Sequence, residues 1–139
     1  MSKLKKFLRD FSFPGWTVPV VLLGLSVASY ALFIPWLKYY WDDIGMIWMW
    51  KNYGADGLLT YDALKRPLRG VLYTWLFPLM GTRPLGWHLL MLAGRWLVSV
   101  LFWLLVKEIW PQRKKMALLA ALAFAVYPGF DQHAVAVIY

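Results

Sequence analysis

Two adjacent carboxylates, Asp42 and Asp43, are the side chains in this sequence best placed to do chemistry. They follow the first long apolar stretch. Such a pair can bind a divalent cation such as Mg²⁺ or Mn²⁺, or supply a general base. Neighbours in sequence point in different directions in a helix or a strand, which favours one acting carboxylate beside one helix-capping carboxylate. On residue chemistry alone, a solvated helix cap is the simpler interpretation. Asp43 is the candidate metal ligand.

Arg95 is the second candidate, because it lies near the middle of an apolar stretch from Pro84 to Val106. A central arginine costs roughly 2.5–3.5 kcal/mol on membrane-insertion scales, so its side chain should face protein or a water-filled cavity. His88, Arg95 and Ser99 fall on one side of a helix and form a polar stripe. Two uses stay open: contact with an anion or phosphate, and a buried pair with Asp131.

The composition indicates that these side chains belong to an integral membrane protein. Hydrophobic residues make up 61% of the chain and charged residues 16%, against roughly 25% charged residues in soluble domains. The net charge is +8, and the basic residues flank apolar runs. That placement suits lipid headgroups and membrane orientation, and it disfavours a nucleic-acid binder. The chain has no cysteine, which excludes disulfides and thiolate metal sites.

We therefore predict an all-α membrane protein with about three transmembrane helices in a single module over residues 1–139. A membrane-spanning helix needs about 20 apolar residues. The predicted spans are 16–37, 84–106 and 116–136. The third is uncharged for only 15 residues before Asp131, so it spans only if residues 127–139 also lie at membrane depth, covered by other protein.

The segments between the spans give the expected orientation. Lysines and arginines at the amino terminus and in the hairpin 107–115 place both in the cytosol. The segment 38–83 then forms an outer loop, with short interfacial or re-entrant helices predicted at 44–53 and 70–82. Gly54 is the expected terminator of the first of these. The default location is a bacterial inner membrane.

Several segments, taken in order, resemble the amino-terminal part of GT-C-type integral membrane glycosyltransferases, a class that includes protein mannosyltransferases. The segments that carry the resemblance are Asp42-Asp43, Lys65-Arg66-Pro67-Leu68, Gly81-Thr82-Arg83-Pro84-Leu85-Gly86-Trp87-His88-Leu89-Leu90 and Ala121-Leu122-Ala123-Phe124-Ala125-Val126-Tyr127-Pro128. The resemblance implies sugar transfer from a polyprenyl-phosphate donor on the outer side of the membrane.

The resemblance also implies roles for individual residues. Asp42 or Asp43 would activate the acceptor or hold a metal ion. The candidates for binding the substrate and its phosphate are Arg66, Arg69, Arg83, Arg95 and His88. A sugar-phosphate leaving group develops negative charge, which positioned guanidinium groups stabilise.

The length of the chain keeps a second function open. Enzymes of this class use many more membrane helices than three, so we expect 139 residues to be an amino-terminal part that does not catalyse alone. The alternative is a small non-catalytic transmembrane subunit at the edge of a larger respiratory or photosynthetic complex. The expected partners are the lipid bilayer, polyprenyl-phosphate lipid and other membrane helices, with no nucleic acid.

Overall fold

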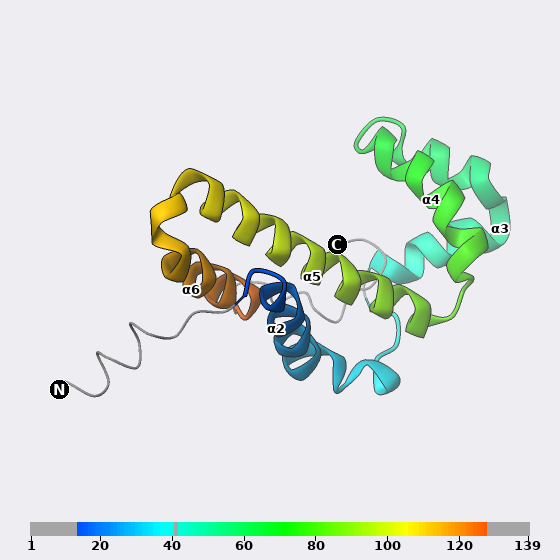
Figure 1. Ribbon diagram of the computed structural model, residues 1–139. Helices are drawn as coiled ribbons and strands as arrows, with labels where there is room; N and C mark the ends of the chain where they lie inside the picture. The colour runs from blue at the N-terminus through cyan, green and yellow to red at the C-terminus, as the bar shows by residue number, and fades with distance from the viewer. Residues whose placement is uncertain (1–13, 41, 128–139) are drawn as a thin grey trace. The chain divides into compact units, whose positions relative to one another are not determined.

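The regular elements of the chain are helices throughout the described residues, which confirms the predicted all-α class. The computed structural model describes residues 14–40 and 42–127. The α-helices are α2 (Thr17–Ser26), α3 (Asp42–Asp62), α4 (Pro67–Met80), α5 (Pro84–Ile109) and α6 (Lys114–Ala125), as Figure 1 shows. Short π and 3₁₀ segments extend them at Val27–Ala31, Ile34–Trp36 and Pro111–Arg113.

Among the residues that the structure describes, two helical stretches are long and apolar enough to cross a membrane. They are Thr17–Trp36, with 20 residues, and Pro84–Ile109, with 26. Only 22% and 17% of the residues in their most apolar windows are buried, whereas the core helix of a soluble protein would be mostly covered. These stretches coincide with the first two predicted spans.

The third predicted span, 116–136, is not confirmed. Its helical part is α6, which has 12 residues, and a helix of that length is too short to cross a bilayer alone. Residues 128–136 lie outside the described residues, as does Asp131. The structure therefore supports two candidate spans.

The contacts within the chain group its residues into two compact units, and each is described by itself. The described residues of unit 1 are 14–31 and 92–127, and those of unit 2 are 32–40 and 42–91. Unit 1 thus holds α2, the later part of α5 and α6. Unit 2 holds α3, α4 and the beginning of α5.

Unit 1 is built on small residues and hydrocarbon side chains. Its buried core consists of Val18, Leu22, Trp103, Val106, Ala117, Ala121 and Ala125. The three alanines recur every fourth residue on α6, and small side chains at this spacing let helices approach closely. The Trp96 indole nitrogen donates a hydrogen bond to the Pro19 carbonyl oxygen over 2.9 Å, which joins α5 to α2. Apolar packing therefore holds unit 1 together, with this hydrogen bond as an additional link between α5 and α2.

Unit 2 is built on aromatic side chains between α3 and α4, which lie side by side in Figure 1. Its buried core consists of Met46, Ile47, Leu58, Tyr73, Phe77 and Trp87. The rings of Trp50 and Phe77 stack with their centroids 4.9 Å apart. The rings of Phe77 and Trp87 lie 4.7 Å apart. Trp87 also donates to the Gly81 carbonyl oxygen over 2.9 Å, so the turn before α5 is tied to this core.

Two glycines set the path of unit 2. The helix α3 breaks at Gly54, whose φ of 60° and ψ of −143° are not helical, and then continues to Asp62. The predicted 44–53 helix is the first arm of α3, and the second arm was not foreseen. The helix α4 begins at Pro67, three residues before the predicted position, and ends at Met80. Gly81 follows with a φ of 66°.

Candidate functional site

The carboxylates of Asp42 and Asp43 lie in the first turn of α3, in two different environments. Asp43 is fully buried, whereas Asp42 is exposed. The Asp43 backbone N–H donates to the Tyr40 carbonyl oxygen over 3.1 Å. The amino-terminal end of a helix favours negative charge nearby, because its first N–H groups lack partners within the helix and the helix dipole is positive there. The two aspartates therefore differ in access to solvent, as expected for sequence neighbours that point in different directions.

Two tyrosines lie in the electrostatic field of Asp43. Burial, with the charge of Asp43, raises the pKa of Tyr39 to about 12. Burial also raises the pKa of Tyr73 to about 12, opposed by the Arg69 charge and aided by Asp62 and Asp43. Both phenols are therefore protonated at neutral pH and able to donate. The Tyr39 hydroxyl is buried and has no hydrogen-bond partner among the residues that the structure describes.

Arg69 is held by a carboxylate that the sequence reasoning did not single out. Its Nε donates to Oδ2 of Asp62 over 3.0 Å, and its Nη2 donates to Oδ1 of the same carboxylate. Asp62 is 1% exposed and the Arg69 side chain 17%. The bond to Asp62 raises the pKa of Arg69. The guanidinium predicted to contact phosphate thus closes the hairpin between α3 and α4.

Gly70 lets this ion pair form. A Cβ atom at this position would meet the Cβ of Asp62 at 3.1 Å and the carbonyl oxygen of Leu58 at 3.2 Å. Both distances are tighter than ordinary van der Waals contact. The absence of a side chain at Gly70 therefore lets α4 approach the end of α3 closely enough for Arg69 to reach Asp62.

Arg66 and Arg83 are exposed, in contrast to Arg69. Each immediately precedes a proline that opens a helix, Pro67 of α4 and Pro84 of α5. Neither has an ion-pair partner within the described part of the chain. A guanidinium combines a full positive charge with several N–H donors of its own, which suits a phosphate. These are the two predicted phosphate ligands whose charge is available.

His88 ties the segment before Asp42 to α5. It is 3% exposed, and its Nε2 lies 3.2 Å from the Lys38 carbonyl oxygen. A carbonyl oxygen only accepts, so Nε2 carries the proton in this contact. This bond fixes the backbone four residues ahead of the aspartate pair. The role of His88 in binding substrate stays a prediction.

Arg95 belongs to unit 1 and is not among the charged residues that unit 2 assembles. Its guanidinium carbon lies 4.2 Å from the centroid of the Tyr30 ring. The Tyr30 hydroxyl donates to the Ala125 carbonyl oxygen over 3.1 Å, and the Ser99 hydroxyl donates to the Arg95 carbonyl oxygen over 2.9 Å. Of these contacts, the one with the Tyr30 ring involves the charged group itself. The predicted partner, Asp131, is outside the described residues.

A metal site at Asp43 stays a prediction. Within residues 14–40 and 42–127, no three or more His, Asp or Glu side chains gather in a way that could hold a metal ion. Mg²⁺ usually keeps several waters and binds one or two carboxylates together with substrate phosphates. The described residues by themselves do not form a complete cation cage.

Comparison with models of protein families finds no match, and comparisons with curated proteins and with solved structures find no similar protein.

Proposed function

We propose that this chain is the amino-terminal part of a membrane glycosyltransferase that moves a sugar from a polyprenyl-phosphate donor on the outer side of the membrane. The observation that carries the proposal is the fully buried carboxylate of Asp43 at the start of α3, just beyond the first candidate span. Buried ionisable groups beside other polar groups are concentrated at functional sites. The segments that resemble the GT-C class, and their order along the chain, add support.

In this proposal Asp43 is the general base, and the acceptor must displace part of the protein that covers its fully buried carboxylate in order to reach it. The carboxylate takes the proton of the acceptor hydroxyl, and the freed oxygen attacks the anomeric carbon of the sugar. The bond between that carbon and the phosphate oxygen breaks, and polyprenyl phosphate leaves with its electron pair. The acceptor gains the glycosyl group, and the proton passes from Asp43 to the departing phosphate.

Arg83 stabilises the leaving phosphate. Negative charge grows on the phosphate oxygens as the glycosidic bond breaks, and a guanidinium group placed there lowers the barrier. The Arg83 side chain is exposed and precedes α5. Arg69 has a different task, because its ion pair with Asp62 sets the geometry of the hairpin.

The membrane topology is part of the proposal. The candidate spans Thr17–Trp36 and Pro84–Ile109 expose most of their apolar surface, which suits lipid as their surroundings. The hairpin between α5 and α6 exposes three cations in succession, Arg113, Lys114 and Lys115. We assign this hairpin and the amino terminus to the cytosol. The segment 38–83 then lies on the outer side, where the donor is used.

A transferase assay on the parent protein in lipid vesicles, with a polyprenyl-phosphate sugar as donor, tests the role of Asp43. Asp43→Asn keeps the shape and removes the base, so kcat should fall by about 10²–10⁴-fold. Asp42→Asn should have a smaller effect. Asp56→Asn is the matched control, because Asp56 is an exposed acid on the same helix. Full activity in both Asp42→Asn and Asp43→Asn would overturn the assignment.

The second candidate is a non-catalytic subunit packed against other membrane helices. It is favoured by apolar side chains of α5 that unit 1 leaves exposed, among them Leu97, Leu101 and Leu105. The intact mass of the purified protein, with its partners identified in the same sample, separates the two. A mass near 16.2 kDa with partners at fixed stoichiometry would favour the subunit. A much larger mass would favour the transferase.

A further inference from the structure

The helix α4 carries an exposed apolar stripe on the side opposite its packed face. Its packed face consists of Gly70, Tyr73 and Phe77, all buried. The stripe consists of Leu68, Leu72, Trp75 and Leu79, which are 84%, 54%, 72% and 74% exposed.

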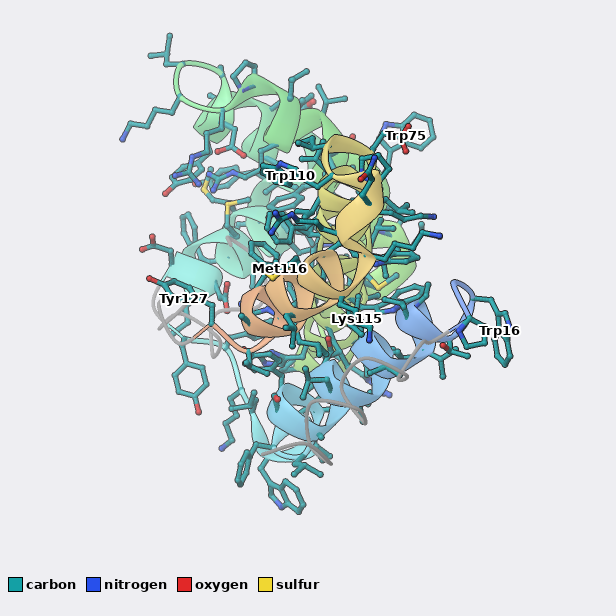
Figure 2. All side chains as sticks on the ribbon, turned by 60° about the vertical axis from the view of Figure 1, so that its left-hand side comes forward. Trp16, Trp75, Trp110, Lys115, Met116 and Tyr127 are labelled. Atoms are coloured by element: carbon teal, nitrogen blue, oxygen red, sulfur yellow. The ribbon has the colours of Figure 1, made fainter. Side chains whose placement is uncertain are left out.

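The positions of the two faces follow from helix geometry. Each residue turns the helix by about 100°, so the stripe residues, spaced by four, three and four, stay within one narrow sector. Gly70, Tyr73 and Phe77 fall on the other side, against α3. Figure 2 shows the Trp75 side chain extending away from the ribbon. The helix thus has protein on one side and an uncovered row of large apolar groups on the other.

The stripe ends beside an exposed basic turn. Leu64, in the turn between α3 and α4, is 98% exposed. Lys65 and Arg66 follow it, both exposed, and neither has an ion-pair partner among the described residues. A row of leucines and a tryptophan that ends in two uncompensated cations matches a lipid interface, where hydrocarbon adjoins phosphate.

We propose that the hairpin of α3 and α4 docks onto the bilayer surface through this stripe. Leu68, Leu72, Trp75 and Leu79 enter the boundary between headgroups and acyl chains, together with Leu64. Lys65 and Arg66 contact the phosphates of anionic phospholipid. The charge of the turn selects this occupant, because an apolar protein partner would not need anionic groups beside the stripe.

Docking in this way would orient the buried carboxylate of unit 2. The helix α3, which carries Asp43, lies on the far side of α4 from the stripe. The stripe would therefore hold α3 toward water while α4 contacts lipid. This inference depends on the chain being at a membrane, and it does not depend on glycosyl transfer.

Single spin labels on the full chain in lipid nanodiscs test the docking directly. The chain has no cysteine, so a label can be placed at one introduced cysteine. Labels at Leu68, Trp75 and Leu79 should collide with lipid-soluble oxygen several times more often than with a water-soluble nickel chelate. The matched controls are labels at Asn52 and Asp56, exposed polar positions on α3, which should show the opposite preference.

Two results would overturn the proposal. Labels on the stripe that are as accessible to the nickel chelate as those at Asn52 would mean that the stripe faces water. Stripe labels shielded from both reagents would mean that protein, either a partner or a second copy, covers it. Circular dichroism of each labelled chain confirms that the helices are retained.

The lipid charge is tested with the label at Leu68. In bilayers rich in phosphatidylglycerol, the ratio of oxygen collisions to nickel-chelate collisions at this label should fall severalfold in the Lys65→Glu, Arg66→Glu double variant. The matched control Lys51→Glu, an exposed lysine on α3, should not change it. Equal depth in the parent and the double variant would overturn the phosphate contact. The label reads depth without any enzyme activity, so an inactive chain with an inserted stripe would refute only the transferase.

Discussion

Unit 1 and unit 2 bury very different chemistry, although both are made of helices from one apolar sequence. The core of unit 1 holds three alanines and aliphatic side chains around Trp103, and its one central charge, Arg95, lies against an aromatic ring. Unit 2 buries two carboxylates, Asp43 and Asp62, within an aromatic core. Buried carboxylates weaken a fold unless specific contacts compensate them. Under the proposed function, unit 1 would serve mainly as an anchor and unit 2 would hold the catalytic carboxylate.

The largest expected effect in this comparison is the loss of the buried ion pair of unit 2. Asp62→Ala leaves the Arg69 guanidinium without its carboxylate, which should lower the free energy of unfolding by about 3 kcal/mol. Arg69 is partly exposed, which places the effect at the lower end for buried pairs. Chemical denaturation of the full chain in detergent micelles, followed by circular dichroism, measures it.

The control for this prediction removes both partners at once. The Asp62→Leu, Arg69→Leu double variant leaves no uncompensated charge, so it should lose less stability than Asp62→Ala. If the double variant were less stable than Asp62→Ala, the ion pair itself would be a net source of stability. The buried Asp62 carboxylate would then not weaken unit 2.

The next largest effect is the change in stability when a glycine is replaced by alanine, which should have opposite signs in the two units. Gly70→Ala should destabilise unit 2 by about 1–2 kcal/mol, because the added Cβ meets Asp62 and the Leu58 carbonyl oxygen. Gly94→Ala, on α5 in unit 1, meets nothing within 4 Å and should stabilise its helix by up to about 1 kcal/mol. The same denaturation assay measures both. A stabilising Gly70→Ala would show that α3 and α4 separate easily.

The smallest effect concerns the tyrosines of unit 2, whose contribution to stability changes only at high pH. An ordinary tyrosine ionises near pH 10, by the usual reference values, and the pKa of Tyr73 in the folded chain is raised to about 12. The protonated phenol is therefore favoured by folding. Its contribution to stability is complete below about pH 10 and is lost as the pH rises through about 12.

Ultraviolet absorbance of tyrosinate, recorded against pH for the parent and for Tyr73→Phe, measures this shift. The difference between the two titrations should show one tyrosine ionising near pH 12 in the folded chain and near pH 10 in denaturant. A difference curve centred near pH 10 in both conditions would mean that the Tyr73 phenol is not buried.

The parts of the fold that could be predicted from sequence are those set by local chemistry. A long, mainly apolar run identifies each candidate span, because burial of apolar side chains in lipid needs only length and composition. Gly54 marks the break in α3 because a glycine tolerates a backbone conformation that other residues avoid. The short helix predicted before Gly54 lies within α3 for the same reason.

The parts that could not be predicted depend on contacts between helices. Ile44, Ile47 and Trp48 recur at helical spacing and would share one face of a helix, yet Ile47 is buried in the core while Ile44 and Trp48 are exposed. No spacing rule joins Asp62 to Arg69 across a turn, or Tyr73 to the environment of Asp43. Adjacent residues are expected to differ in exposure, but which of Asp42 and Asp43 is buried depends on the packing of α3, which local sequence does not encode.

The glycines at the two joints of unit 2 have a consequence for chirality. Gly54 and Gly81 share nearly the same backbone angles, with ψ values of −143° and −157°, and a Cβ at either would meet nothing within 4 Å. Space does not exclude a side chain there; handedness does. Reflected in a mirror, both joints become the common extended conformation of an ordinary L-residue. A D-amino acid would therefore fit at each joint without strain. Glycine, which is achiral, reaches the same conformation and lets a chain of L-amino acids turn at both joints.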